Sequence, residues 1–215
     1  MRTLVVGGHT RNIGKSALVV DIIRAFPEAA WTAVKITQYG HGVCAVNGEE
    51  CHCAPDDHAF ALDEEHERNN RTDTSRFLAA GAARALWVRT KRGRLAEALP
   101  LLREELKYAE NVILESNSVL RFVRPRLYLV VLDPGKADFK ETSRHFLDRA
   151  DACVLRSPLQ GGVLLEPVEG QRAVSLHLLE GKMCFMQPLG EGIPSDLVEL
   201  IRERFFMKPG TFGAS

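Results

Sequence analysis

The chain has 215 residues, of which 45% are hydrophobic and 26% charged, a composition sufficient for the core of one α/β domain. Lys and Arg together number 28, as do Asp and Glu, so the near-zero net charge argues against a nucleic-acid or membrane partner. No apolar run approaches the roughly 20 residues of a membrane-spanning helix. The N-terminus runs almost directly into a strand pattern without a signal peptide, which predicts a cytoplasmic protein.

Short apolar runs alternate with amphipathic segments along the chain. We expect strands at residues 3–6, 31–36, 59–62, 85–88, 112–114, 127–132 and 153–155. We expect helices at residues 16–26, 74–83, 95–108, 141–150 and 195–206, the last of them capped by Ser195. Residues 174–178 and 182–186 flank a Glu-Gly turn and are expected to pair as a small C-terminal β-hairpin. The alternation predicts a mostly parallel sheet with helices on both faces and ligands at the carboxyl ends of its strands.

The segment between the first strand and the first helix has the pattern of a phosphate-binding loop. The common pattern is Gly, four residues, then Gly-Lys-Ser/Thr; here the first glycine is Gly8, one place early, so that five residues intervene. Backbone N–H groups of such a loop wrap phosphates at a helix N-terminus, Lys15 can reach the β- and γ-phosphates, and the Ser16 hydroxyl can ligate Mg²⁺. The expected nucleotide-binding residues are Gly8, His9, Thr10, Arg11, Asn12, Ile13, Gly14, Lys15, Ser16 and Ala17. The alternative, a strand-to-helix turn that binds nothing, is disfavoured because strand, loop, Gly-Lys-Ser and helix follow in order.

Three charged residues are expected at the same edge of the sheet. Lys35 closes the second strand, where it can pair with a phosphate or a substrate anion, the alternative being a solvated lysine. Glu115 closes a buried strand, where it can hold Mg²⁺ or orient an attacking water; the alternatives are a helix cap or an ion pair. Asp73 stands at the start of a helix and is either a Mg²⁺ ligand or an N-cap. The expected catalytic residues are therefore Lys15, Lys35 and Glu115, with Ser16, Glu115 and Asp73 around Mg²⁺.

These segments resemble known families. The longer loop resembles that of dethiobiotin synthetase and the cobyric acid synthases. With Lys35, the Asp73-Thr74-Ser75-Arg76 segment and Glu115, the chain resembles the molybdopterin-guanine dinucleotide biosynthesis protein B family over roughly residues 3–132. The length fits a single P-loop NTPase domain over residues 1–215. The resemblance implies a homodimeric accessory or adaptor that works with a protein partner in molybdenum-cofactor assembly.

The chain also departs from that family. The family's Lys-His is separated into Lys35 and His41, and its Glu-Gly is replaced by Glu115-Ser116-Asn117. Residues 135–138, Gly-Lys-Ala-Asp, only partly match the guanine-reading Asn-Lys-x-Asp pattern, and we interpret them as a chance match. The sequence therefore leaves GTP and ATP open.

A Cys- and His-rich insertion is expected at about residues 39–58. Cys44, Cys51 and Cys53, with His58 or His41, make a tetrahedral Zn²⁺ set, although their spacing is not a standard knuckle. The alternative is a substrate-facing loop of reduced cysteines. The other two cysteines, Cys153 and Cys184, fall in apolar strand patterns and are expected in the core.

Three functions follow from these features. The first is a nucleoside-triphosphate-binding protein with slow Mg²⁺-dependent hydrolysis, which acts by positioning and charge stabilisation. The second is a small-molecule kinase or ATP-dependent ligase in which Lys35 binds the substrate anion. The third is a non-catalytic metal-binding or interaction protein.

Overall fold

The apolar, β-branched runs of the sequence form the strands of one eight-stranded sheet, since strands buried on both faces need such residues. The computed structural model describes residues 1–39, 59–136, 138–158, 163–165, 174–175 and 179–207. The strands are β1 (Arg2–Gly8), β2 (Thr32–Tyr39), β3 (Phe60–Glu64), β4 (Arg84–Lys91), β5 (Asn111–Glu115), β6 (Leu127–Leu132), β7 (Ala152–Leu155) and β10 (Met183–Met186). Their order is β10-β7-β6-β1-β5-β2-β4-β3. Every neighbouring pair is parallel except β3–β4, which is antiparallel.

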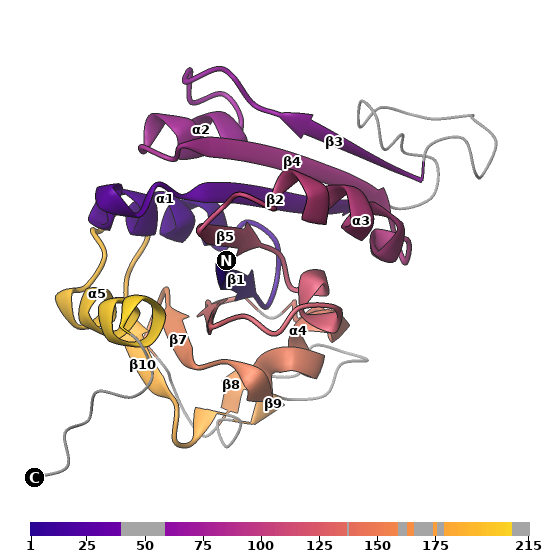
Figure 1. Ribbon diagram of the computed structural model, residues 1–215. Helices are drawn as coiled ribbons and strands as arrows, with labels where there is room; N and C mark the ends of the chain where they lie inside the picture. Colours follow the sequence, from indigo (N-terminus) through magenta and orange to yellow (C-terminus); the bar gives the residue numbers. More distant parts are fainter. Residues whose placement is uncertain (40–58, 137, 159–162, 166–173, 176–178, 208–215) are drawn as a thin grey trace, which may run out of the picture.

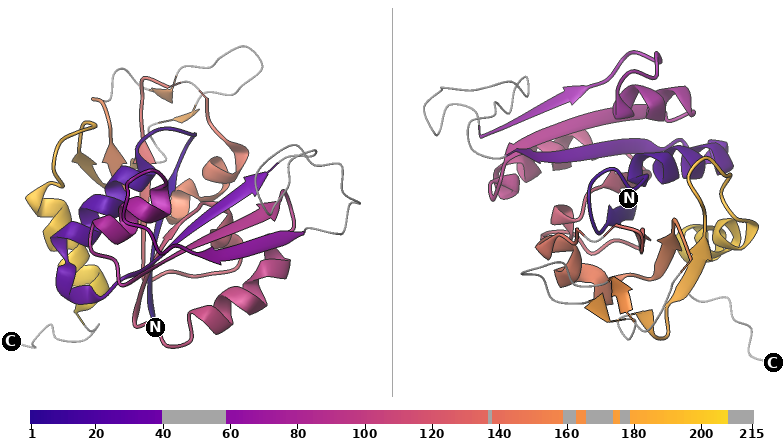
Figure 2. Two further views of the ribbon diagram at one scale, coloured as in Figure 1. Left: turned by 90° about the horizontal axis from the view of Figure 1, so that it is seen from above. Right: turned by 180° about the vertical axis from the view of Figure 1, so that it is seen from behind.

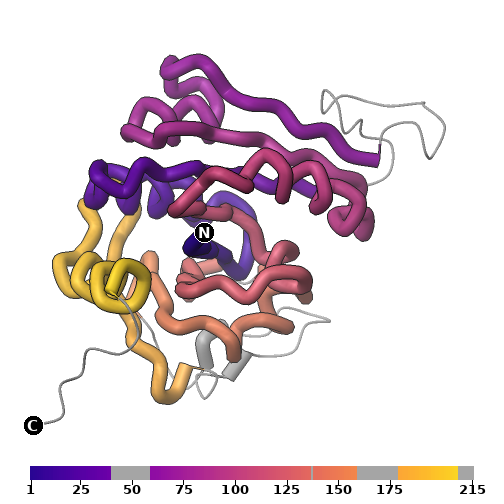
Figure 3. Tube along the Cα trace, in the orientation of Figure 1, coloured from indigo at the N-terminus to yellow at the C-terminus, as the bar shows by residue number. Residues whose placement is uncertain are grey.

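Helices cover both faces of this sheet, which confirms the predicted three-layer α/β architecture (Figures 1 and 3). The helices α1 (Lys15–Ala25), α2 (Asp73–Ala79) and α5 (Ser195–Ile201) pack on one face, and α3 (Leu95–Glu105) and α4 (Glu141–Phe146) pack on the other. Short single turns η1 (Pro27–Ala29), η2 (Ser118–Arg121) and η3 (Leu147–Arg149) join them, and a π-helix η5 (Arg202–Phe206) extends α5. None of the helices in the described residues is long and apolar enough to span a membrane.

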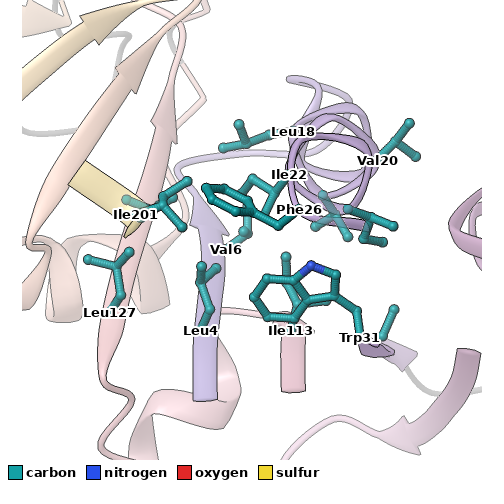
Figure 4. Close-up of a cluster of buried hydrophobic side chains, with 14 of the residues drawn as sticks. Leu4, Val6, Leu18, Val20, Ile22, Phe26, Trp31, Ile113, Leu127 and Ile201 are labelled. Carbon is teal, nitrogen blue, oxygen red and sulfur yellow. The ribbon is translucent and has the colours of Figure 1, made fainter. Parts of the chain in front are cut away.

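The core on the α1 face is formed by side chains of the central strands and three helices (Figure 4). Leu4 and Val6 of β1 meet Leu18 and Ile22 of α1, and all four are fully buried. Complete burial of one such side chain contributes about 1.5–3 kcal/mol. This packing fixes α1 against β1 and thereby fixes the loop that joins them.

The central strands end at one edge of the sheet, and β1, β5 and β2 lie side by side there (Figure 2). The register pairs Val6 of β1 with Glu115 of β5, and Glu115 with Lys35 of β2. The loop before α1 starts from the same edge. The charged residues that the sequence predicted at the ligand edge are therefore neighbours.

The C-terminal region differs from its prediction. The expected hairpin is wrong, because β9 (Val174–Ser175) pairs with β8 (Val163–Leu165), while β10 joins the main sheet parallel to β7. This arrangement buries Phe185 of β10 against α5. Cys153 is buried as predicted, but the expectation that Cys184 lies in the core is wrong: β10 is the edge strand of the sheet, and Cys184 is exposed there. Ser195 is the first residue of α5, and the N-cap is Pro194 without a side-chain hydrogen bond.

Candidate functional site

The loop between β1 and α1 is tightly folded, and it requires glycine at Gly8 and Gly14. A Cβ on Gly8 would lie 2.7 Å from Cδ1 of Ile13 and 2.9 Å from Cδ of Lys15, so Gly8 lets the loop fold back over the strand end. Gly14 has a φ of 81° and Asn12 a φ of 54°, both in the left-handed region that glycine and asparagine tolerate best. Left-handed residues in such a turn point successive N–H groups to one side, as in anion-binding nests.

The backbone amides of the loop fall into two groups. The N–H of Gly8 donates to Oδ1 of Asn117 at 2.9 Å, and the N–H of His9 donates to the carbonyl of Val131 at 3.2 Å. Within the described part of the chain, the amides of residues 10–14 donate to no protein acceptor. The first two residues of the predicted site therefore support the loop through their backbone, while the following five keep their donors for a ligand.

Lys15 spans the mouth of the loop. Its ammonium donates to the carbonyl of Thr10 at 2.8 Å, so the side chain crosses the loop above the amides. Burial lowers the pKa of Lys15 to about 8, although the nearby Glu115 carboxylate acts in the opposite direction. An ammonium with a lowered pKa gains stability when an anion replaces the carbonyl, which is the chemistry of phosphate binding.

Four side chains meet beside the N-terminus of α1. The Ser16 hydroxyl donates to Oε2 of Glu115 at 2.8 Å, and Glu115 is only 6% exposed. The Lys35 ammonium contacts Asp73 and lies 3.5 Å from Oε1 of Glu115 and 3.4 Å from Oγ of Ser16. The structure thus brings together Ser16, Lys35, Asp73 and Glu115, all four expected at this edge. Two carboxylates and a hydroxyl already surround one positive charge, which is the oxygen donor set that Mg²⁺ prefers.

The N-cap of α2 is Thr72, so the N-cap alternative for Asp73 is wrong. The Thr72 hydroxyl accepts from the N–H of Ser75, and the Ser75 hydroxyl accepts from the N–H of Thr72. The Asp73 carboxylate is therefore available to Lys35 and Arg76. Burial raises the pKa of Asp73, but the hydrogen bond and charge of Lys35 outweigh it and hold the pKa below its usual value.

Asn117 holds the end of β1, and the sequence alone did not indicate this role. Its amide nitrogen donates to the carbonyl of Gly8 at 2.7 Å and to the Ser143 hydroxyl at 2.6 Å, and its Oδ1 accepts from the N–H of Gly8. The Ser143 hydroxyl donates to the same carbonyl at 2.7 Å. Asn117 therefore fixes the peptide from which the loop starts.

Arg156 holds the other end of the loop and was also not predicted. This side chain follows β7 and is 7% exposed. It donates to the carbonyls of Ile13 and Gly14 at 3.1 and 2.7 Å, and to the carbonyl and side-chain oxygen of Gln187 at 2.8 and 3.0 Å. A lone arginine after a strand carries no sequence signal for such a role, since its partners come from segments more than 30 residues away.

The imidazole of His9 is structural. The ring is 1% exposed, donates from Nε2 to the carbonyl of Lys136 at 3.1 Å, accepts at Nδ1 from the N–H of Asp133 at 3.4 Å, and packs against Phe139. Burial lowers the pKa of His9, which favours the neutral form that these bonds need.

Two residues of the Gly-Lys-Ala-Asp stretch, which the sequence suggested was a chance match, contact the loop between β1 and α1. Lys136 donates from Nζ to the carbonyl of Asn12 at 2.7 Å, and Asp138 accepts from the Thr10 hydroxyl. Lys136 and Asp138 therefore support the loop.

The predicted zinc ligands Cys44, Cys51, Cys53 and His58 lie outside the described residues, as does His41. Among the residues that are described, no group of three or more His, Cys, Asp or Glu side chains is arranged to hold a metal ion.

Comparisons with known proteins found similar solved structures but no matching sequence. No protein-family model and no curated protein sequence matches the chain. Eight chains of solved structures match. They include LpxK from Aquifex aeolicus in complex with ATP, with a TM-score of 0.47 and 17% identity over 86% of this chain and 53% of that one. They also include HypB from Helicobacter pylori in complex with nickel, with a TM-score of 0.35 and 13% identity over 71% and 62% of the two chains.

The chain thus spans about half the length of LpxK and less than two thirds of HypB. These TM-scores are too low to support any conclusion about its reaction. Its own topology, with the Gly14-Lys15-Ser16 loop between a central parallel strand and a helix, gives the class: an α/β protein with a P-loop NTPase fold.

Proposed function

We propose that this protein binds a nucleoside triphosphate with Mg²⁺ and hydrolyses it slowly. The observation that carries the proposal is the hydrogen bond between Ser16 and Glu115, which lies beside the amides of residues 10–14 that donate to no acceptor among the described residues. It joins the two oxygen ligands at the position where the loop would present the β- and γ-phosphates.

The residues around Lys35 fit a Mg²⁺ site. Ser16 and Glu115 would hold the ion, with Asp73 as a third ligand, because all three oxygens already contact or approach the Lys35 ammonium. When bound, the ion would neutralise charge on the β- and γ-phosphates.

The side chains of this chain then act by positioning. The amides of residues 10–14 and the N-terminus of α1 bind the phosphate oxygens. Lys15 leaves the Thr10 carbonyl and binds the β- and γ-phosphates. Lys35, released from Asp73 and Glu115, stabilises negative charge that develops on the transferred group.

Isothermal titration calorimetry with Mg²⁺ and either ATP or GTP tests this function, together with phosphate release in the absence of an acceptor. Wild-type protein should bind at least one nucleotide and release phosphate slowly. Lys15→Met should weaken nucleotide binding by at least tenfold. Lys107→Met changes an exposed lysine just after α3 and should leave nucleotide binding unchanged. Failure of both nucleotides to bind would refute the proposal and favour a non-catalytic metal-binding or interaction protein.

A small-molecule kinase or ATP-dependent ligase is the second candidate, and one observation favours it. Lys35 lies beside the predicted Mg²⁺ ligands and also at the start of a half-exposed stretch of sheet. Nucleotide consumption that requires an added acceptor would support this reaction over simple hydrolysis.

The narrower roles implied by the family resemblance stay predictions. They are guanine-dinucleotide molybdenum-cofactor assembly, a protein partner, a homodimer and a cytoplasmic location. Light scattering coupled to gel filtration tests the dimer. Metal analysis of untagged protein tests zinc at Cys44, Cys51, Cys53 and His58; less than about a tenth of an equivalent would contradict it.

A further inference from the structure

One face of β2 and β4 is buried and apolar near the amino ends of the strands and becomes polar and partly exposed farther along them. Near their amino ends, Ala33 and Ala85 are fully buried under Phe77 of α2. Figure 1 shows α2 beside these ends, while both strands run on past it. Farther along the same face, Lys35, Thr37, Tyr39 and Trp87 are only partly buried. The sheet face that a helix usually covers is thus polar and half open next to the phosphate loop.

The strand register arranges these residues in rows. Glu115, Lys35, Trp87 and Asp63 are consecutive partners across β5, β2, β4 and β3. Since neighbouring strands lie about 4.8 Å apart, the backbone at Trp87 is about 10 Å from that at Glu115. A small molecule stacked on the Trp87 ring would therefore be long enough to place one functional group next to Glu115, a predicted Mg²⁺ ligand.

The next row adds a second cation. Arg89 pairs with Thr37 across the strands, and its guanidinium carbon lies 4.5 Å from the centre of the Trp87 ring. Burial raises the pKa of Tyr39, while the charges of Arg89 and Lys35 lower it, so both cations act on the Tyr39 hydroxyl.

Each of the two cations contacts a carboxylate. Arg89 donates to Asp63, which is 57% exposed, and Lys35 donates to Asp73, one of the predicted Mg²⁺ ligands. Mg²⁺ at Asp73 would free Lys35, and a ligand anion could displace the exposed Asp63 from Arg89. A guanidinium and an ammonium beside an indole ring suit a ligand that has both a ring and a negative charge.

We propose that Lys35, Thr37, Tyr39, Trp87 and Arg89 form an acceptor platform that binds a small molecule with a planar ring and a phosphate or carboxylate group. The inference rests on the second candidate function, a small-molecule kinase. An oxygen of the bound molecule would bond to the γ-phosphorus as the bond to the β,γ-bridging oxygen breaks. The bridging oxygen keeps the electron pair in the nucleoside diphosphate, and the acceptor proton passes to solvent.

The probes are phenyl phosphate and inorganic phosphate. They are titrated into nucleotide-free Lys15→Met protein, in which the loop no longer competes with the platform for phosphate. By calorimetry, Lys15→Met protein should bind phenyl phosphate at least tenfold more tightly than it binds inorganic phosphate. Phenyl phosphate should quench tryptophan fluorescence, and the signal comes from Trp87 because Trp31 is 1% exposed. Trp87→Leu should abolish both the preference and the quenching, while Tyr108→Leu, at an aromatic residue 87% exposed elsewhere, should abolish neither.

Asp63→Asn is expected to strengthen ligand binding, a result that a misfolded protein would not give. Removing the competing carboxylate should tighten phenyl phosphate binding several-fold, while Glu104→Gln, an exposed carboxylate paired with Lys107, should not. Equal affinity for the two probes, a preference that survives Trp87→Leu, or unchanged affinity in Asp63→Asn would overturn the platform. Calorimetry of wild-type protein with ATP and GTP is a separate measurement, so loss of the nucleotide function is distinguishable from loss of the platform.

Discussion

The ammonium of Lys35 contacts the Asp73 carboxylate and lies 3.5 Å from Oε1 of Glu115. It therefore occupies the position between the two carboxylates at which we propose that Mg²⁺ binds. A lysine in this place compensates the repulsion of the two carboxylates while no metal is present.

Lys35→Met should strengthen divalent-cation binding to the nucleotide-free protein. Two carboxylates without their ammonium repel each other, and at close range this repulsion is a few kcal/mol even at an effective dielectric constant near 20. We expect about tenfold tighter Mn²⁺ binding, measured by electron paramagnetic resonance of free Mn²⁺. The same substitution should slow phosphate release, because the charge-stabilising ammonium is lost. Lys107→Met is the control, and unchanged or weaker Mn²⁺ binding in Lys35→Met would contradict the competition.

Nucleotide binding should take up protons near pH 8. Burial lowers the pKa of Lys15 to about 8, so a large fraction of this ammonium is deprotonated at that pH in the free protein. Phosphates favour the charged form and raise the pKa, so protons are taken up between about pH 8 and 10.5. Calorimetry in buffers of different ionisation enthalpy measures the uptake, which should approach zero at pH 6.5.

Lys15→Met should also change how stability depends on pH. The folded protein binds fewer protons at Lys15 than the unfolded chain does between about pH 8 and 10.5, so this group makes unfolding less favourable as the pH rises. The free energy of unfolding of wild-type protein should therefore increase across that range relative to Lys15→Met. A constant difference between the two proteins would show that Lys15 is not buried as described.

Arg156→Met should destabilise the loop between β1 and α1, because Arg156 donates to two of its carbonyls. The substitution leaves the carbonyl of Ile13 without the Arg156 donor and the carbonyl of Gly14 with the N–H of Leu18 alone, at a cost of about 2–4 kcal/mol in the free energy of unfolding. Nucleotide affinity should fall by at least tenfold in protein that is still folded, as judged by circular dichroism. Arg24→Met, at the exposed end of α1, should change neither quantity.

Gly7→Ala should destabilise the protein through a clash in the core. A Cβ at Gly7 would lie 2.8 Å from the Tyr128 hydroxyl oxygen and closer still to Oδ1 of Asn117. We expect a loss of about 1–3 kcal/mol in urea denaturation and weaker nucleotide binding, because Asn117 holds Gly8. Gly192→Ala is the matched control, since a Cβ there has no neighbour within 4 Å. A stability equal to that of wild type would show that Asn117 is free to move.

Local patterns in the sequence were enough for much of the fold. The β-branched runs of β1, β5 and β6 and the amphipathic period of α1 and α3 depend on neighbours along the chain, so their existence was predictable. The site was predictable to the same extent: Gly14-Lys15-Ser16 is a local motif, and Lys35 and Glu115 each end a recognisable strand. The C-terminal hairpin was wrong because a Glu-Gly turn signal says nothing about which distant strand edge is open to β10.

Only the tertiary structure decided how these residues work together. The contact of Lys35 with Asp73, and the hydrogen bonds from Arg156 to Gly14 and from Asn117 to Gly8, join segments between 38 and 142 residues apart. Such contacts depend on strand order and register, which set the distances between side chains at the sheet edge and leave no local pattern in the chain. The sequence by itself thus determined that a Gly-Lys-Ser loop joins the first strand to the first helix, while the sheet determined which side chains support that loop and which face of β2 and β4 is open beside it.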